Sequence, residues 1–411
     1  MMEQLLKNWH DFFDGVSRFG YEEGLGTTRL SWSPEFDGAA NFLAEKARAA
    51  GLQVHADSWG NEIFTIPGKN PQLPPVYTGS HLDSVPHGGK YDGMLGVTAP
   101  LAIAKAWLEE GFQPERTVTI IGFAEEEGTR FHMPTLGSKA ITGELQGKST
   151  DTFLTKEGKS LTSLLQEDSR HLTGDPLAPS LHSGKCYLEL HIKQGRYLED
   201  QGLPLGIVTA IVGIRHFYLT VNGTANHAGT TAMKDRHDAL AAASHLITSI
   251  YQAALASNRA YVATVGQIQV EPGAQNVVPG QCSFTLEMRS EKDSIMDTAE
   301  ATIREKIKEI EALSGVSFAM KPIDTIPPVP MNASLMELFQ TKAHACGIPF
   351  QLQPSWAGHD AQIIGQHLPA AMLFVPSVKG ISHAKEEYTR DEDIAKALQV
   401  LDQTLRQVAS E

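Results

Sequence analysis

The sequence predicts an α/β fold with a second, inserted α+β domain. Over most of the chain, short apolar runs typical of buried strands alternate with longer helical segments such as Val97–Glu110. This alternation is typical of βαβ units and a mostly parallel sheet. The stretch from Ile211 to Thr325 instead shows the order β-α-β-β-α-β, which is the ferredoxin-like arrangement. We therefore expect one domain over residues 1–210 and 330–411, and a second over 211–329.

The first domain has four apolar runs that predict strands. They are Pro75–Gly79, Val118–Phe123, Cys186–Ile192 and Ala371–Val375. Polar and reactive side chains occur at or just after the end of each run. Because ligands of open α/β sheets bind beyond the carboxyl ends of the strands, the four strand ends predict one shared site.

The inserted domain combines strands with two amphipathic helices. Its predicted strands are Arg215–Asn222, Tyr261–Val270, Cys282–Arg289 and Val316–Ile323. The helices are predicted over Asp238–Leu255 and Ser294–Leu313, each with its apolar residues on one face. The proline-rich segment Ile326–Pro330 is predicted to be a linker back into the first domain.

Composition narrows the class of protein. With 34 basic and 48 acidic residues the formal charge is −14, which argues against nucleic acid as a partner. The three cysteines are odd in number and widely spaced, so neither a disulfide framework nor a zinc ribbon is expected. The N-terminus lacks the apolar stretch of a signal peptide, and no run of about 18 apolar residues suits a membrane span. We expect a cytoplasmic protein without membrane segments.

The segment Gly79–Gly96, GSHLDSVPHGGKYDGMLG, carries the first candidate metal ligands. His81 and Asp92 offer an imidazole and a carboxylate, the usual ligands of zinc or manganese. Asp83 lies two residues after His81, where a carboxylate is expected to orient the ring. A glycine-rich surface loop is the alternative interpretation.

Three further motifs make the metal hypothesis specific. Phe123–Phe131, FAEEEGTRF, places three adjacent carboxylates after a strand, where either a cation or solvent must compensate them. One such carboxylate can bind a metal while its neighbour takes a proton from water. His191 in ELHIKQG and His383 in GISHAKEE end the series. Each motif alone is weak, but the order HxD…D…EEE…H…H is a strong signal.

With these motifs the chain resembles the M20 metallopeptidase superfamily, and within it the branch of allantoate amidohydrolases and N-carbamoyl-L-amino-acid hydrolases. The resemblance covers nearly the whole chain. It extends to NHAGTTAM at Asn226–Met233, QNVVPG at Gln275–Gly280, AGHDAQ at Ala357–Gln362 and GISHAKEE at Gly380–Glu387. It implies a zinc-peptidase-like catalytic domain with an inserted lid and dimerisation domain.

The resemblance also implies two divalent metal ions per subunit, with Mn²⁺ expected and Zn²⁺ fitting the same ligands. By motif, one ion would be held by His81, Asp92 and His191. The second would be held by Asp92, Glu127 and His383, so that Asp92 bridges the pair. Glu126 is then expected to be the general base that acts on the bridging water.

The lid is expected to supply substrate contacts. His227 resembles the histidine that stabilises the oxyanion and that the partner subunit of a homodimer provides; a polar turn is the alternative. Arg215, Asn276 and Arg289 resemble residues that clamp a substrate carboxylate, for which the planar fork of arginine is suited. The alternative for each of these three is a surface residue on a sheet. Gln194 and His359 are further candidates for pocket contacts.

The expected substrate is a small anionic ureido compound. Arg215 would suit the second polar arm of allantoate, whose hydrolysis to ureidoglycine, ammonia and carbon dioxide belongs to purine degradation. An N-carbamoyl-L-amino acid is the alternative, and activity on peptides is less expected because the lid motifs match the ureido branch. Lys193 replaces a glutamate of the family pattern, Trp356 a glycine and Ala232 a proline. These departures keep open a homologue that binds ureido compounds without cleaving them.

Overall fold

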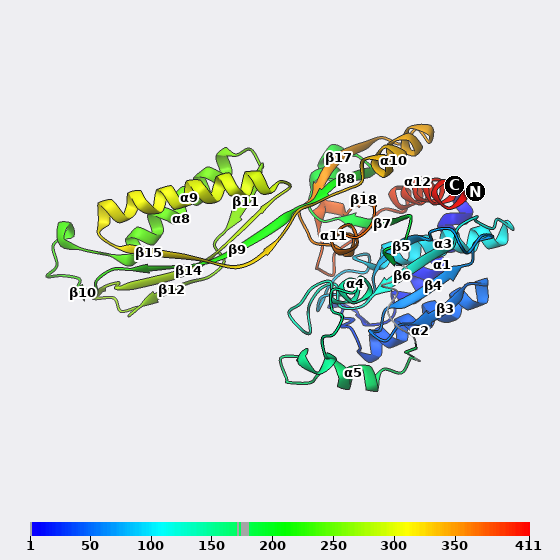
Figure 1. The fold of residues 1–411 in the computed structure, drawn as a ribbon, viewed down its shortest axis with the longest axis horizontal. Helices are drawn as coiled ribbons and strands as arrows, with labels where there is room; N and C mark the ends of the chain where they lie inside the picture. Colours follow the sequence, from blue (N-terminus) through cyan, green and yellow to red (C-terminus); the bar gives the residue numbers. More distant parts are fainter. Residues whose placement is uncertain (1, 171, 174–180) are drawn as a thin grey trace. The chain divides into compact units, whose positions relative to one another are not determined.

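The computed structural model describes residues 2–170, 172–173 and 181–411, and the chain divides into two compact units (Figure 1). Unit 1 comprises Met1–Thr209, Met331–Gln353 and Ala357–Glu411. Unit 2 comprises Ala210–Pro330 and Pro354–Trp356. The sequence placed the three residues of Pro354–Trp356 in the first domain, but they group with unit 2 because Ser355 accepts a hydrogen bond from the Val212 N–H.

A mixed nine-stranded sheet forms the centre of unit 1, although its edge strand Val329–Pro330 and the last residues of two other strands fall within the bounds of unit 2 (Figure 1). Its strands are β3 (Gln53–Ala56), β4 (Glu62–Ile66), β5 (Val76–His81), β6 (Val118–Phe123), β7 (Cys186–Lys193), β8 (Leu205–Ile211), β16 (Val329–Pro330), β17 (Phe350–Ser355) and β18 (Ala370–Pro376). The order is β16-β8-β18-β7-β5-β6-β4-β3, and β17 also pairs with β8. The central strands β18, β7, β5 and β6 are parallel to one another, whereas the pairs β16–β8, β8–β18, β6–β4 and β4–β3 are antiparallel, so the sheet is less parallel than predicted.

The predicted linker Ile326–Pro330 is partly wrong, because its last two residues form β16 and pair with β8. The four central strands match the four apolar runs closely. All residues of β5, β6, β7 and β18 are buried, as continuous apolar strands covered on both faces must be.

Helices cover the sheet of unit 1. They are α1 (Met2–Val16), α2 (Pro34–Ala50), α3 (Met94–Glu109), α4 (Leu136–Ile141), α5 (Leu161–Glu167), α7 (Tyr197–Gln201), α10 (Ala333–Ala345), α11 (Asp360–Ile364) and α12 (Asp391–Ser410). A small hairpin of β1 (Tyr21–Glu22) and β2 (Gly26–Thr27) precedes α2. Helices α1, α3 and α12 pack against one another, and the indole of Trp107 in α3 donates to Asp402 in α12 over 2.6 Å.

Helix α2 illustrates how the sequence sets helix ends. The Ser33 side chain caps the first turn by accepting the Phe36 N–H, and Pro34 occupies the first position, where no N–H is needed. Gly51 closes the helix in the left-handed conformation at φ 102°.

Unit 2 is a ferredoxin-like sheet with two helices. Its strands are β9 (Gly213–Asn222), β11 (Tyr261–Thr264), β12 (Ile268–Glu271), β14 (Gln281–Ser290) and β15 (Ser317–Ile326), with α8 (Ala239–Ala256) and α9 (Asp293–Ser314). The order β11-β14-β9-β15 has neighbours that are all antiparallel. The single strand predicted over Tyr261–Val270 is in fact two, β11 and β12, which both pair with β14. A two-residue ladder joins β10 (Asn226–His227) to β13 (Val277–Val278).

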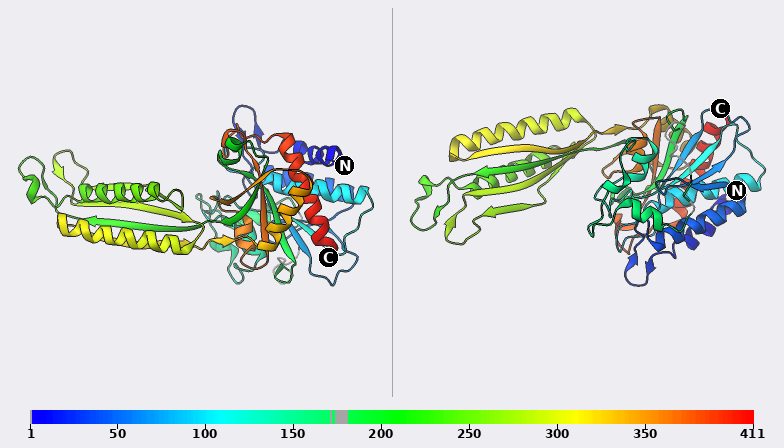
Figure 2. Two further views of the ribbon diagram at one scale, coloured as in Figure 1. Left: turned by 90° about the horizontal axis from the view of Figure 1, so that it is seen from above. Right: turned by 60° about the horizontal axis from the view of Figure 1, so that its bottom comes forward.

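The two helices of unit 2 lie on one face of its sheet (Figure 2). Side chains of a strand alternate between faces, so residue parity decides which layer each one meets. In β9 and β14 the core under the helices is formed by Phe217, Leu219, Val221, Cys282, Phe284, Leu286 and Met288. Odd-numbered residues of β9 and even-numbered residues of β14 therefore face the helices, and the remaining residues face away from them.

Candidate metal centre

Three histidines converge on the carboxylate of Asp92. Its Oδ1 lies 3.5 Å from His81 Nε2 and 3.2 Å from His191 Nε2. Its Oδ2 lies 3.1 Å from His383 Nε2, which is itself 3.6 Å from Glu127 Oε1. The two oxygens of one carboxylate thus face two different groups of side chains.

Hydrogen bonds fix which ring nitrogen of two histidines faces this carboxylate. His81 Nδ1 lies 3.0 Å from the Asp83 carbonyl, and His191 Nδ1 lies 3.1 Å from the Ile192 carbonyl. Because a carbonyl only accepts, each Nδ1 carries a proton and each Nε2 carries a lone pair in the neutral ring. The Nε2 of His191 is buried and has no hydrogen-bond partner, as suits an atom that ligates a metal.

The loop between β5 and α3 brings Asp92 back to His81. Gly93 immediately precedes α3 at φ 67°, and a Cβ atom there would lie 2.4 Å from the His81 ring. Glycine is needed at this position both for its conformation and for the close approach of the ring. The end of the glycine-rich motif is therefore folded tightly against the His81 ring, whereas Pro86 and His87 in its middle are exposed.

Asp83 holds the turn that carries Glu126 and Glu127. Its two oxygens accept the N–H groups of Glu126 over 3.1 Å and of Glu127 over 3.2 Å. Its carboxylate is 3.7 Å from His81 Nδ1, farther than its own carbonyl. The expectation that the Asp83 carboxylate orients the His81 ring is corrected, since the backbone carbonyl performs that task.

The first glutamate of the EEE run was not assigned from the sequence. Glu125 is fully buried at φ 59°, and its Oε1 accepts the N–H groups of Arg130 over 2.6 Å and Phe131 over 3.1 Å. It closes the turn beneath Glu126 and Glu127. The three carboxylates therefore differ in task, although the sequence makes them look equivalent.

Buried negative charge dominates the electrostatics of the cluster. Burial raises the pKa of Glu126 well above its usual range and raises the pKa of Glu127 to about 7. The hydrogen bond to Asp92 raises the pKa of His383 to about 9. Burial opposes ionisation of Asp92, yet the three histidines that face it, His191, His383 and His81, hold the pKa of its carboxyl well below the usual range.

These side chains form donor sets that fit metal ions. His81, Asp92 and His191 offer ligand atoms within 4.8 Å of one another, and so do Asp92, Glu127 and His383. The sets share Asp92 and mix imidazole nitrogen with carboxylate oxygen, which zinc and manganese accept. A third set, Glu126 and Glu127 with His81, overlaps both. The sequence-predicted ligands and base are brought together by the fold.

Gln194 and His359 also lie at the cluster. Gln194 Nε2 donates to Asp92 Oδ2 over 3.0 Å. His359 packs edge-on against the His191 ring at 4.5 Å between centroids, and burial holds its pKa well below the usual range. Lys193, one of the departures from the family pattern, is buried with its amino group 5.2 Å from the centre of the Phe374 ring.

The lid candidates belong to unit 2. His227 and Asn276 are exposed, and His227 Nδ1 accepts the N–H groups of Gly229 over 3.1 Å and Thr230 over 3.2 Å. The proton of the neutral ring is therefore on Nε2. Ala232, where the family pattern has proline, is already in an extended conformation at φ −61°.

Arg289 and Arg215 lie on opposite faces of the lid sheet. Arg289 faces away from the helices, where it donates to Glu287 Oε1 over 2.7 Å and to the Trp356 carbonyl over 2.9 Å. Arg215 faces the helix layer and pairs with three carboxylates of α9, those of Asp293, Asp297 and Glu300. The expectation that both arginines clamp one carboxylate is corrected for Arg215, because odd positions of β9 point to the helices.

The side chain of β9 that shares a face with Arg289 is His216. Its Nε2 lies 2.9 Å from Glu287 Oε2 and its Nδ1 lies 2.5 Å from Asp324 Oδ1. Burial works against protonation, but these two carboxylates outweigh it and raise the pKa of His216. Parity along the strand is the sequence signal that could have selected His216 over Arg215.

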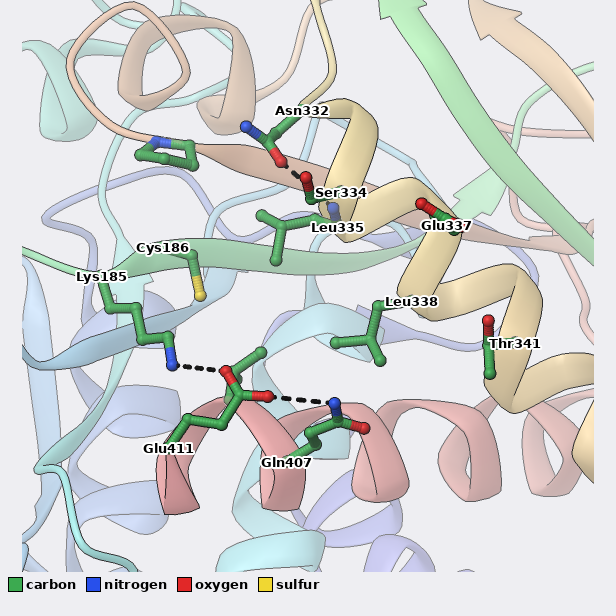
Figure 3. A pocket seen from close by; sticks show the side chains of 12 residues that line it. Lys185, Cys186, Asn332, Ser334, Leu335, Glu337, Leu338, Thr341, Gln407 and Glu411 are labelled. Carbon is green, nitrogen blue, oxygen red and sulfur yellow. Dashed lines mark hydrogen bonds and ion pairs between the residues drawn. The ribbon is translucent and has the colours of Figure 1, made fainter.

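A cavity of about 590 Å³ lies at the start of β7 and β18 (Figure 3), whereas the candidate metal ligands His191 and His383 lie toward or beyond the ends of these strands. Its polar groups pair with one another, since Glu411 accepts from Lys185 over 2.8 Å and from Gln407 over 3.0 Å. Burial raises the pKa of the Cys186 thiol in its wall to about 12, so the thiol is protonated and unreactive. This cavity is not the candidate catalytic site.

Comparison with known proteins agrees with the geometry. Residues 77–407 match Peptidase family M20/M25/M40. The chain belongs to the M20 family. It is 35% identical to an N-carbamoyl-L-amino acid amidohydrolase of Geobacillus stearothermophilus and 33% identical to an allantoate amidohydrolase of Escherichia coli strain K12, in both cases over 96% of each chain. A hydantoinase/carbamoylase family amidase from Burkholderia ambifaria superposes with a TM-score of 0.90 at 30% identity, covering 98% of this chain and 97% of that one.

These findings establish the general activity. The chain is an M20 hydrolase that acts on C–N bonds, and its family binds divalent metal ions. The expected fold class, a catalytic α/β domain with an inserted lid, is confirmed.

The M20 ligand set predicts that metal affinity rises with pH. Without metal, His383, whose pKa is about 9, is protonated at neutral pH, and Glu127, whose pKa is about 7, is partly so. A bound ion displaces these protons, so affinity should gain about tenfold per pH unit for each proton displaced, and level off above the pKa of His383. Calorimetric titration with Mn²⁺ in buffers of different ionisation enthalpy measures both the affinity and the protons released. Affinity that is flat or falls with pH would contradict the protonation states described.

Proposed function

We propose that this M20 hydrolase is an allantoate amidohydrolase, which cleaves a ureido C–N bond of allantoate to give ureidoglycine, ammonia and carbon dioxide. The observation that carries the choice of substrate is the polar character of the lid face around Arg289. His216, Glu287 and Asp324 surround it with charged groups rather than apolar ones. A substrate whose second arm is a polar ureido group suits this face better than an apolar side chain does.

An N-carbamoyl-L-amino acid is the second candidate. Relatives of that name are as similar to this chain as those named for allantoate, at 35% against 33% identity. Both substrates carry a carboxylate for Arg289 and a ureido carbon for the metal centre. The two reactions differ in the group that lies beyond the carboxylate, which is why His216 and Glu287 are the deciding residues.

The metal centre supports a two-ion mechanism in which Asp92 is shared. We infer that His81 and His191 hold one ion and that Glu127 and His383 hold the other, with Mn²⁺ favoured by the carboxylate ligands and Zn²⁺ as the alternative. When bound, the ions lower the pKa of a water molecule and polarise the scissile carbonyl. Glu126, with Oε2 at 3.8 Å from His81 Nε2, accepts the proton of the attacking water and returns it to the leaving nitrogen.

His227 is proposed to stabilise the oxyanion. Its Nδ1 is occupied by two backbone N–H groups, so Nε2–H is the free donor of the ring. A donor aimed at developing negative charge contributes roughly 3–4 kcal/mol to the transition state. Arg289 is proposed to bind the substrate carboxylate, while Asn276 and Gln194 provide further polar contacts.

A homodimer in the cytoplasm completes the proposal. Helix α8 has no charged residue along Ala239–Ala256, and Tyr251 and Leu255 on its outer face are 62% and 65% exposed. Among the described residues, α8 is also the one helix whose length and hydropathy would suit a membrane span. A second copy of the chain is the partner we propose for this face.

The cysteines support the proposed location in the cytoplasm. All three are free thiols, which suits a reducing compartment.

Ammonia release from the Mn²⁺-loaded protein tests the proposed reaction, with allantoate and N-carbamoyl-L-amino acids assayed side by side. We expect preferential turnover of allantoate. Glu126→Gln should lower kcat by about 10²–10⁴-fold, because the general base is lost, while the metal content stays unchanged. Preferential turnover of a carbamoyl amino acid would contradict the substrate assignment alone. Absence of turnover with both substrates and both ions bound would contradict the catalytic role.

The two lid arginines should separate in their kinetics. Arg289→Met is expected to raise KM for allantoate by roughly 10–100-fold, since a charge-assisted hydrogen bond contributes about 1.5–3 kcal/mol. Arg215→Met, the matched control on the opposite face, should leave KM unchanged and reduce the stability of the lid by about 1 kcal/mol. Steady-state kinetics and urea denaturation measure the two effects. A raised KM in the Arg215 variant would contradict the assignment of the two faces.

A complementation experiment tests the dimer and His227 together. Two inactive variants, Glu126→Gln and His227→Ala, are co-expressed and the mixed dimer is purified with two affinity tags. If His227 acts on the partner subunit, one site in the mixed dimer has both Glu126 and His227 and activity returns. An inactive mixed dimer would show that His227 acts within its own chain, and an active His227→Ala protein would show that His227 is not needed.

Tyr251→Glu with Leu255→Lys should convert the dimer to a monomer in sedimentation velocity, and a persistent dimer would contradict the α8 interface.

A further inference from the structure

Glu387 is a buried carboxylate that accepts a hydrogen bond from the backbone of Asp92, the ligand shared by the two candidate metal sites. It lies on the segment after β18 that also carries His383, and it is 4% exposed. Its Oε1 accepts the backbone N–H of Tyr91 over 2.8 Å and that of Asp92 over 3.1 Å. One oxygen of Glu387 therefore fixes the backbone on which the Asp92 side chain is mounted.

The other oxygen of Glu387 reaches the Asp92 carboxylate through a serine. The Ser382 hydroxyl lies 3.0 Å from Glu387 Oε2 and 3.0 Å from Asp92 Oδ2. A hydroxyl has one proton, so it donates to one of the two carboxylates at a time. Asp92 is thus contacted at two points, at its backbone N–H by Glu387 directly and at its side-chain Oδ2 by Ser382.

Gly89 makes room for this arrangement. A Cβ atom at position 89 would lie 2.0 Å from Glu387 Oε1 and 2.4 Å from Glu387 Cβ. Unlike Gly93, Gly89 does not have a positive φ, so its lack of a side chain is required for space rather than for conformation. Position 89, the second glycine of HGGKYDG, must therefore lack a side chain because Glu387 occupies the space beside it, although the two residues are almost 300 positions apart in the chain.

We propose that Glu387 is a positioning residue that holds the bridging carboxylate Asp92 in the orientation required by both metal ions. This assignment rests on the proposed two-metal function. Residues that orient metal ligands in this way change metal affinity or activity by about 10–100-fold when they are mutated. Glu387 belongs to none of the candidate ligand sets, and it acts on Asp92 through the backbone N–H groups of Tyr91 and Asp92 and through Ser382.

The chain offers a matched control next to Glu387. Glu386 has the same side chain but is exposed, and its Oε1 lies 4.0 Å from Lys385 Nζ. Replacing either glutamate by alanine removes one negative charge from the same turn. A difference between the two variants therefore reports on the hydrogen bonds to Tyr91, Asp92 and Ser382, not on net charge.

The test is a titration of Mn²⁺ into the metal-free full-length protein, followed by calorimetry and by the electron paramagnetic resonance signal of free Mn²⁺. Glu387→Ala should weaken Mn²⁺ binding about 10–100-fold, and Glu386→Ala should bind as wild type does. Glu387→Gln should restore most of the affinity, because its amide oxygen accepts the two N–H groups and its NH₂ donates to Ser382. Gly89→Ala should resemble Glu387→Ala, because the new methyl group displaces the carboxylate.

Each outcome bears on the assignment. Wild-type affinity in Glu387→Ala, or equal loss in Glu386→Ala, would overturn it. If Glu387→Ala does not fold, Ser382→Ala decides, with weaker Mn²⁺ binding expected and unchanged binding contradictory. A purely structural role would lower the thermal stability of the metal-free protein without changing the affinity of the folded protein. Wild-type protein that binds no Mn²⁺ would overturn the proposed function as well, whereas two tight ions in both wild type and Glu387→Ala would overturn this assignment alone.

Discussion

The constraint on which the catalytic unit depends is the burial of negative charge around Asp92. A carboxylate taken out of water is strongly destabilised unless cations or hydrogen bonds compensate it. Here Asp92, Glu126 and Glu127 lie together beyond the carboxyl ends of the central strands. The cationic groups in ion-pair contact with them are the side chains of three histidines, His81, His191 and His383. Histidines compensate only when they are protonated, and neutral histidines are metal ligands. The same cluster therefore either binds protons or binds metal ions, and this competition ties its chemistry to pH.

The arrangement is held by loops that are far apart in the sequence. The four parallel strands bring His81, the EEE run, His191 and His383 to one edge of the sheet, but the strands alone do not set the orientation of the side chains. Buried acids perform that task by accepting backbone N–H groups. Asp83 holds the turn of Glu126 and Glu127, and Glu387 holds the backbone of Asp92. A fixed ligand frame of this kind limits rearrangement when an ion binds, and it gives Asp83 and Glu387 a role although neither is a proposed ligand.

The sequence predicts the strands, the helices and the composition of the cluster because these depend on local patterns. Continuous apolar runs locate β5, β6, β7 and β18, and ligand residues at the strand ends locate the cluster. The tasks of Asp83, Glu125 and Glu387 could not be predicted, because each depends on hydrogen bonds to backbone groups that only the folded loops bring near. Arg215 shows the opposite error. Its residue type suits a carboxylate clamp, but strand parity turns it toward three acids of α9, and His216 takes the outer face.

Metal content per chain tests the central claim, that one carboxylate is shared by two metal sites, most directly. Mass spectrometry of Mn²⁺-loaded protein after removal of free metal would compare wild type with Asp92→Asn, His191→Ala and His383→Ala. We expect two ions in wild type, about one in each histidine variant and essentially none in Asp92→Asn, because Oδ1 and Oδ2 of Asp92 face different ligand sets. An Asp92→Asn protein that retains an ion as tightly as wild type would contradict the shared carboxylate.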